Sequence, residues 1–168
     1  MILLKRKLIP QQNLTKIAHS PKGLFVFKTD VRNQFHPFEL LNYDKNPTLI
    51  VPLRRTSRVT ERLLDQHGFH IKDAHYIDIL SKHINSSLRH KKTTYLHNVT
   101  LNEIREAITE KISEFGPGPK TLIIEDLHAL IPHHGELNAR RFIDHLSKNM
   151  DEQMTKTIVL TNHSKLPK

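Results

Sequence analysis

The segment Thr121 to Leu127, with the sequence TLIIEDL, constrains the fold more than any other stretch of this chain. A Gly-Pro-Gly-Pro turn at 116–119 leads into it, and three branched apolar residues precede two acids. A short apolar run bounded by turn signals is typical of a strand buried on both faces, as at the centre of a parallel sheet. α/β proteins bind their ligands at the carboxyl edge of such sheets. The segment therefore predicts an α/β fold with a functional edge at Glu125 and Asp126.

Strand and helix patterns alternate along the rest of the chain, with no hairpin signal between strands. Besides the segment at Thr121, strands are predicted at Leu24 to Lys28, Thr48 to Leu53, Ala74 to Leu80 and Thr157 to Thr161. Helices are predicted to start at Pro10, at Pro37, at Thr56 or Ser57, at Thr100 and at Ala139. This order predicts a three-layer α/β fold, with helices on both faces of a mainly parallel sheet of five or slightly more strands.

Two basic segments interrupt this pattern. Residues 1–22 carry lysine and arginine but no acid, with an edge strand expected near Ile2 to Leu4 and a helix over Leu14 and Ile17. Residues 82–98 form a long basic connection with no clear periodicity, which is usually functional or disordered in a compact domain. A length of 168 residues favours one domain that spans 1–168.

The amino-acid composition indicates which kind of partner and which cellular compartment the chain is suited to. The formal net charge of +9 and the pI of about 9.9 favour an anionic partner, although an indifferent basic surface is an equal alternative. The chain has no cysteine, which excludes disulfides and thiolate metal sites and fits a reducing compartment. No apolar run approaches the roughly 18 residues of a membrane span. We therefore expect a cytoplasmic protein without a membrane partner.

Three pieces of the chain together resemble the RecA/KaiC-like ATPase core that is widespread in archaea. They are LLDQHG at Leu63 to Gly68, HYIDIL at His75 to Leu80, and TLIIEDLHAL at Thr121 to Leu130. The resemblance spans roughly Gly23 to Leu166 and is one of pattern more than of diagnostic motifs. It implies a sheet like that of P-loop NTPases of the RecA type, with Thr121 to Leu127 as the Walker B strand.

The Walker-B-like strand departs from the family pattern at its end. Glu125 stands where the family has an aspartate that orients Mg²⁺ or a water, and Asp126 follows. Because side chains alternate along a strand, the two acids are expected to face opposite sides of the sheet, so that only one points at a ligand. The alternative is that one or both pair with lysine or arginine at the sheet edge.

The larger departure lies upstream, after the first core strand. A P-loop needs glycines that let backbone N–H groups cradle phosphates, followed by Lys and Ser or Thr. The loop at 29–36 contains no glycine, and no glycine occurs anywhere between Gly23 and Gly68. The resemblance therefore implies a degenerate relative that lacks the P-loop, takes no cofactor and does not hydrolyse ATP.

The same part of the sequence offers residues for two kinds of metal site. Acids near predicted strand ends resemble the clusters with which Rossmann-like nucleases hold two metal ions, and they are Asp30, Asp78, Glu125 and Asp126. Histidines near Glu125 could in principle ligate a metal, but their spacing matches no known motif and favours solvated loop residues; they are His128, His133, His134 and His163.

Basic side chains provide the candidate contacts for an anion or a nucleic-acid backbone. They are Arg54, Arg55, Arg58, Arg62, Lys91 and Lys92. The first three stand at a strand end and a helix start on the same sheet edge as the acids. The chain has no Trp and only three Tyr, so stacking platforms for bases are scarce.

These observations favour a non-catalytic binding or regulatory module that associates with a protein partner, such as an active ATPase relative or a second copy. The first alternative is an accessory protein that contacts the phosphate backbone of nucleic acid. The second is a metal-dependent Rossmann-like nuclease.

Overall fold

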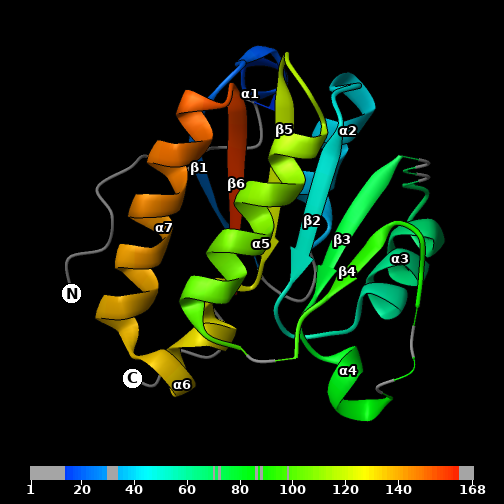
Figure 1. The fold of residues 1–168 in the computed structure, drawn as a ribbon. Helices are drawn as coiled ribbons and strands as arrows, with labels where there is room; N and C mark the ends of the chain where they lie inside the picture. Colours follow the sequence, from blue (N-terminus) through cyan, green and yellow to red (C-terminus); the bar gives the residue numbers. More distant parts are fainter. Residues whose placement is uncertain are drawn as a thin grey trace.

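A computed structural model describes residues 14–29, 34–69, 71, 73–85, 87, 89–97 and 99–162. Within them lies a six-stranded, all-parallel sheet in the order β1-β6-β5-β2-β3-β4 (Figure 1). The strands are β1 (Gly23–Thr29), β2 (Thr48–Pro52), β3 (Ala74–Asp78), β4 (Thr93–Tyr95), β5 (Lys120–Glu125) and β6 (Thr155–Asn162). The predicted α/β class and parallel sheet are confirmed.

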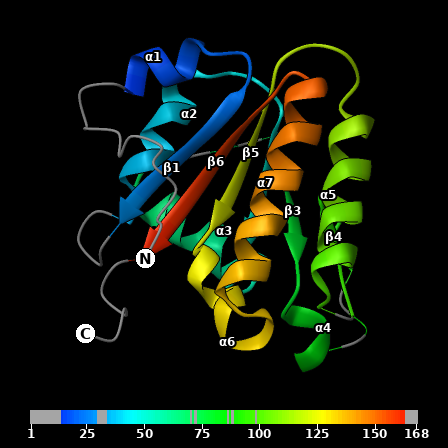
Figure 2. The same cartoon turned by 90° about the vertical axis from the view of Figure 1, so that its left-hand side faces the viewer.

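Helices cover both faces of the sheet, which Figure 2 shows nearly edge-on between them. The larger helices are α3 (Ser57–Gln66), α5 (Leu101–Glu114) and α7 (Glu136–Glu152). The shorter ones are α1 (Leu14–His19), η2 (His36–Glu39), α2 (Leu40–Tyr43), α4 (Ser81–Ile84), η3 (Leu127–Leu130) and α6 (Ile131–His134). α5 and α7 pack on one face, and α1, η2, α2 and α3 pack on the other. No helix among the described residues is long and apolar enough to span a membrane.

β5 occupies the centre of this arrangement, between β6 and β2. All six of its residues are buried. Leu122 and Ile124 pack in the core beneath α5 and α7, while Ile123 packs in the core beneath α1 to α3. This alternation is the one that a strand buried on both faces requires. The expectation that the TLIIEDL segment forms a strand buried on both faces is therefore confirmed.

The edges of the sheet differ from the sequence-based expectation. β4 and α4 lie within the segment predicted to be irregular, and β4 pairs in parallel with β3. The strand escaped prediction because it is three half-buried residues long and carries no apolar run. β1, expected to be a core strand, lies at the other edge and pairs only with β6 among the described strands.

The helix starts agree with the capping signals. At the start of α5, Thr100 and Glu103 form the reciprocal capping box that their spacing predicts. Thr56 caps α3 by accepting a hydrogen bond from the Val59 amide at 3.3 Å. Val59 itself is 40% exposed, and the buried residues of α3 are Ser57, Thr60 and Leu64. The edge strand and helix start expected at Ile2 to Leu4 and Pro10 lie outside the described residues.

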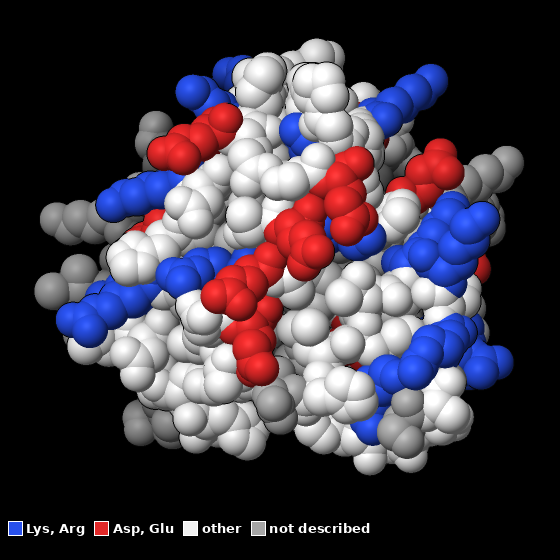
Figure 3. Space-filling view, in the orientation of Figure 1, with Lys and Arg blue, Asp and Glu red and all other residues white. Residues whose placement is uncertain are grey.

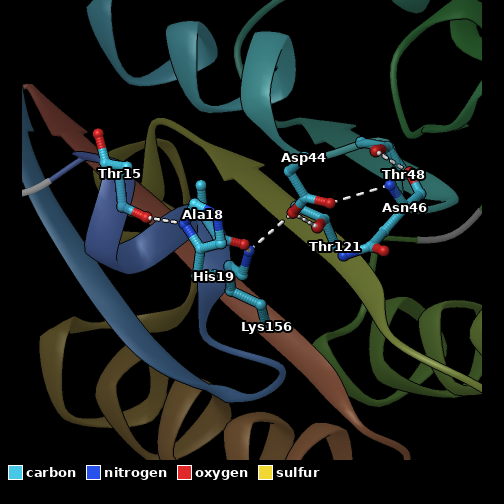
Figure 4. Close-up of polar contacts among 8 residues, drawn as sticks. All are labelled: Thr15, Ala18, His19, Asp44, Asn46, Thr48, Thr121 and Lys156. Carbon is cyan, nitrogen blue, oxygen red and sulfur yellow. Dashed lines mark hydrogen bonds and ion pairs between the residues drawn. The ribbon is translucent and has the colours of Figure 1, made fainter.

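A buried polar cluster joins four segments at the amino-terminal end of the strands (Figure 4). Lys156 Nζ of β6 donates to Asp44 Oδ2 at 2.7 Å and to the Ala18 carbonyl of α1 at 2.8 Å. Thr121 Oγ1 of β5 donates to the same Asp44 oxygen at 2.6 Å. The other Asp44 oxygen accepts from the Asn46 amide at 2.9 Å. These contacts fix α1 and the α2–β2 turn against the sheet.

Candidate functional site

The carboxyl ends of β2 and β5 meet at a topological switch point. β2 and β5 are neighbours in the sheet, but the chain continues from β2 to β3 on one side and from β5 to β6 on the other. Because the two connections leave in opposite directions, this is the position in the sheet at which α/β proteins commonly bind ligands, and it is called the crevice below. The loop that begins at Leu53 lies on one side of the crevice, and the loop that begins at Asp126 lies on the other.

Two ion pairs bridge this crevice. Arg54 Nε lies 2.7 Å from Asp126 Oδ2, and an Arg55 terminal nitrogen lies 2.9 Å from Glu125 Oε1. The Leu53 amide also donates to the Glu125 carbonyl at 3.2 Å. Both carboxylates are buried, with exposed side-chain fractions of 8% for Asp126 and 7% for Glu125. The sheet edge thus brings together four of the candidate residues as two neutralised pairs.

The two pairs are built differently. Glu125 continues the strand alternation on the side of Ile123, where Arg55 lies 5.7 Å from the centre of the Phe35 ring and donates to Gln34 at 3.2 Å. Asp126 has left the strand and adopts a left-handed backbone with φ of 60°. That conformation is unusual for a residue other than glycine, although aspartate tolerates it better than most.

Burial makes the charge on Glu125 costly. Desolvation raises the pKa of Glu125, the nearby Arg55 opposes that rise, and the neighbouring Asp126 charge adds to it. Glu125 Oε2 and Asp126 Oδ1 are buried without a hydrogen-bond partner. Each acid therefore uses one oxygen on an arginine and keeps the second enclosed.

Asp78, another candidate acid, is fully buried at the end of β3. Its carboxylate accepts hydrogen bonds from the amide and hydroxyl of Ser57, both at 2.7 Å, and from the amide and hydroxyl of Ser81, at 2.8 and 2.6 Å. The Leu80 amide adds a fifth bond at 2.9 Å. Burial alone would raise the pKa of Asp78, but the bonds from Ser81 and Ser57 outweigh it and lower that pKa. Asp78 thus fastens β3 to the starts of α3 and α4.

The expected metal ligands do not assemble in the described part of the chain. Among those residues no group of three or more histidines and acids is placed to hold a metal ion. Asp30, from the nuclease hypothesis, and His163, from the histidine-ligand hypothesis, lie outside the described residues. His128 is half-buried, and its Nδ1 atom is enclosed without a hydrogen-bond partner.

Comparison with known proteins identifies the fold. No family model matches this chain, and no curated protein matches its sequence. Among solved structures, a KaiC-like protein from the hyperthermophilic archaeon Pyrococcus horikoshii OT3 superposes with a TM-score of 0.63 at 14% sequence identity. The chain has a KaiC-like fold. The match covers 89% of this chain and 66% of the archaeal protein, so the chain spans just under two thirds of that protein's length.

In this KaiC-like fold, the strand with the TLIIEDL sequence is β5, and the glycine-free loop follows the edge strand β1. Residues 30–33 of that loop lie outside the described residues. The identity of 14% bears on the fold alone, so what the crevice does must be inferred from its own residues.

The other basic candidates lie away from the crevice acids. Arg58 and Arg62 are exposed on α3, where an i, i+4 spacing puts them on one side of the helix. Lys91 is exposed beside β4, and Lys92 Nζ lies 3.6 Å from Asp73. Arg54 and Arg55, grouped with them on sequence grounds, are instead committed to Asp126 and Glu125.

Two hollows near the crevice were not expected from the sequence. The first, called here the carboxyl-end cavity, has a volume of about 320 Å³ and opens beside Leu53 at the end of β2. The second, the α5–α7 groove, has a volume of about 260 Å³ and runs along the two helices between Arg105 and Arg141. The only sequence signal near them was the histidine pair at 133–134, because the walls come from segments far apart in the chain.

Proposed function

We propose that this KaiC-like domain is a non-catalytic module that lacks the phosphate cradle and acts by associating with a protein partner. The observation that carries the proposal is the pairing of Arg54 with Asp126 and of Arg55 with Glu125. Those four side chains fill the edge at which the family resemblance would place a metal-orienting acid. A sheet edge closed in this way is suited to holding the fold together.

Phosphoryl transfer depends on positioning and on charge neutralisation by a backbone cradle, a lysine and Mg²⁺. For Glu125 or Asp126 to accept a metal ion, its arginine would first have to release it, which would leave a partly buried guanidinium unpaired. The loop after β1 supplies no glycine for close approach to phosphates. Both features argue against ATP hydrolysis.

Exposed apolar side chains support association with protein. Ile84 of α4 is 79% exposed, and Leu137 in the first turn of α7 is 57% exposed. Both follow the carboxyl ends of strands, at the end of the sheet where α4 and α6 lie in Figure 1. Exposed aliphatic side chains of this size are suited to contacts with a partner, either an active ATPase relative or a second copy of this chain.

The catalytic part of the proposal is tested by phosphate release from purified protein with Mg²⁺ and ATP. We expect no turnover above a protein-free control. Glu125→Gln serves as the matched variant, because contaminating ATPases would be unaffected by it. Turnover that disappears in Glu125→Gln would overturn the proposal.

The association part is tested with Ile84→Asp combined with Leu137→Asp. The control is Tyr43→Ser, which removes a side chain that is 60% exposed on α2, towards the other end of the sheet. Sedimentation velocity over a range of concentrations detects self-association, and cross-linking in the source cells detects another partner. We expect a stoichiometric partner with wild type and Tyr43→Ser that is lost in the double variant. No partner with any form would contradict the proposal.

Nucleic-acid binding is the second candidate, favoured by the exposed Arg58 and Arg62. Figure 3 shows an acidic band over α5, with basic side chains on either side of it, over α7 and on the side where α4 and β4 lie, so a phosphate backbone is expected to lie away from α5. Backbone binding would fall steeply between about 50 and 200 mM salt. Arg58→Gln with Arg62→Gln would flatten that dependence, whereas Arg54 and Arg55 must be kept because they pair with buried acids. No oligonucleotide retention at low salt would eliminate this candidate.

A metal-dependent nuclease is the third candidate. Asp78, one of its proposed ligands, accepts five hydrogen bonds from Ser57, Leu80 and Ser81. Cleavage of a labelled oligonucleotide that requires a divalent metal would support the nuclease. Unchanged substrate with Mg²⁺ and with Mn²⁺ would exclude it.

A further inference from the structure

The carboxyl-end cavity reaches into the main core of the protein. Its walls include Leu53, Ile79 and Leu130, which are buried members of the core beneath α5 and α7, and the half-buried Ala129. The volume of about 320 Å³ lies at the lower end of the range, about 300 to 1,000 Å³, that small-ligand pockets occupy. His83, His133 and His134 complete the lining, and the aliphatic part of the wall suits the hydrocarbon part of a ligand.

The α5–α7 groove next to it is cationic. Arg105 of α5 and Arg141 of α7 line it together with His145, and Phe142 contributes an apolar surface. No acidic residue lines the groove. The Glu106 carboxylate accepts a hydrogen bond at 2.8 Å from the side chain of Asn102, which lines the groove, so this acid lies beside the groove without lining it. The groove therefore offers donors for an anionic group.

The two arginines keep their donors available. Arg141 makes no hydrogen bond or ion pair within the described part of the chain, and it is exposed. Arg105 donates to the Asn102 side chain through one terminal nitrogen, which leaves its other N–H groups for a ligand. Arg140, the neighbour of Arg141, instead pairs with Glu136 at 3.2 Å and does not line the groove.

His134 connects the hollows, because it lines both of them. It belongs to α6, whose position between η3 and α7 places it at the boundary. We propose that the carboxyl-end cavity and the α5–α7 groove form one binding site for an amphiphilic carboxylate. The apolar chain occupies the cavity, and the carboxylate lies between Arg105 and Arg141. This site adjoins the ion-paired crevice, because Leu53 borders both, but it uses none of the four ion-paired side chains. It does not depend on the protein association proposed above.

Octanoate is the probe for this site. Octanol, which has the apolar chain without the charge, and acetate, which has the carboxylate without the chain, are the two comparison compounds. Binding is followed by amide chemical-shift changes in ¹⁵N-labelled protein. We expect octanoate to shift resonances of residues 129–134 and of the first turns of α5 and α7. Octanol should shift mainly the cavity resonances, and acetate should bind at least about tenfold more weakly than octanoate, because it buries almost no apolar surface.

Three variants test the two halves separately. Ala129→Phe fills the cavity and should abolish binding of both octanoate and octanol. Arg141→Gln should weaken octanoate about two- to fivefold, as expected for one exposed ionic contact, and leave octanol unchanged. Arg140→Gln is the matched control on the next residue and should change neither. Thermal melts check the fold, and Leu80→Phe, at a half-buried cavity residue, replaces Ala129→Phe if that variant unfolds.

Several results would overturn the proposal. If octanoate at millimolar concentration leaves the spectrum unchanged, or shifts only resonances outside both hollows, the site is excluded. If Arg141→Gln and Arg140→Gln lose octanoate affinity equally, the groove does not bind the carboxylate. Full octanoate affinity in a folded Ala129→Phe or Leu80→Phe protein would remove the role of the cavity.

Discussion

Asp44 and Lys156 form an ion pair that is completely enclosed at the amino-terminal end of the sheet. The Lys156 Nζ to Asp44 Oδ2 distance is 2.7 Å, and the exposed side-chain fractions are 0% for the lysine and 1% for the aspartate. Enclosed charges are tolerated only where further hydrogen bonds satisfy them, and here Ala18, Thr121 and Asn46 supply those bonds. The pair therefore specifies how α1 and the α2–β2 turn dock on the sheet.

The first prediction concerns this pair. Lys156→Met alone should destabilise the protein by about 3–5 kcal/mol, because it leaves the Asp44 charge enclosed and unpaired. Lys156→Met combined with Asp44→Leu should recover much of that loss, since neither charge then remains. Urea denaturation of the four proteins of this cycle measures the effect. A single variant as stable as wild type would show that the pair contributes nothing.

The second prediction concerns the central strand. Ile123 and Ile124 are each 1% exposed and pack on opposite faces of β5. Truncating either to alanine should cost about 2–5 kcal/mol through lost burial and the cavity left behind. Val59→Ala, at an exposed position of α3, is the control and should change little. Unchanged melting temperatures in both isoleucine variants would contradict the central placement of β5.

The third prediction concerns Asp78. Asp78→Asn should destabilise the protein by about 3 kcal/mol near pH 7, because the amide cannot accept all the bonds that Ser57 and Ser81 donate to the charged group. The pKa of Asp78 is lowered in the folded protein, so this stabilisation is complete above the ordinary value of 3.8 and is lost as the pH falls through the lower, folded value. The difference in free energy of unfolding between wild type and Asp78→Asn should therefore shrink as the pH falls through this acidic range. A gap that stays constant with pH would refute the role of the charge.

The fourth prediction concerns Arg55. Arg55→Gln should cost about 1–3 kcal/mol near pH 7, less than a fully enclosed pair, because the Arg55 side chain is 20% exposed. The pKa of Glu125 is already raised by burial, and removing Arg55 should raise it further. An acid whose pKa is raised by folding binds its proton more tightly in the folded state, so protonation stabilises the fold as the pH falls. The difference in free energy of unfolding between wild type and Arg55→Gln should therefore close between neutral pH and about 4.5, the ordinary glutamate value. Chemical denaturation at several pH values measures it, and a gap that widens with acidity would contradict the prediction.

The interior of the sheet and the long helices could be predicted from the sequence because their signals are local. The apolar run at 121–124 and the capping pair of Thr100 and Glu103 each report on their own segment. β4 could not be predicted, because three half-buried residues become a strand only through pairing with β3. The edge position of β1 also depends on which strand lies beside it, and no local pattern records that.

The candidate site was predictable in part for the same reason. The order of elements placed Arg54, Arg55, Glu125 and Asp126 at one sheet edge, but which arginine meets which acid depends on the register of β2 against β5. That register pairs Pro52 with Glu125, so the residues that follow each strand lie opposite one another. The carboxyl-end cavity depends on side chains from Leu53 to His134 and has no sequence signature.

The position of β6 has a consequence for synthesis of the protein on the ribosome. β6 lies between β1 and β5, although it is the last of the described strands to emerge. Gly23 pairs with Lys156, so β1 has no neighbour among the described strands until β6 has been made. Until then the edges of both β1 and β5 are open to other nascent chains. Shielding of these edges by a chaperone, rather than early folding, is therefore the expected safeguard during translation.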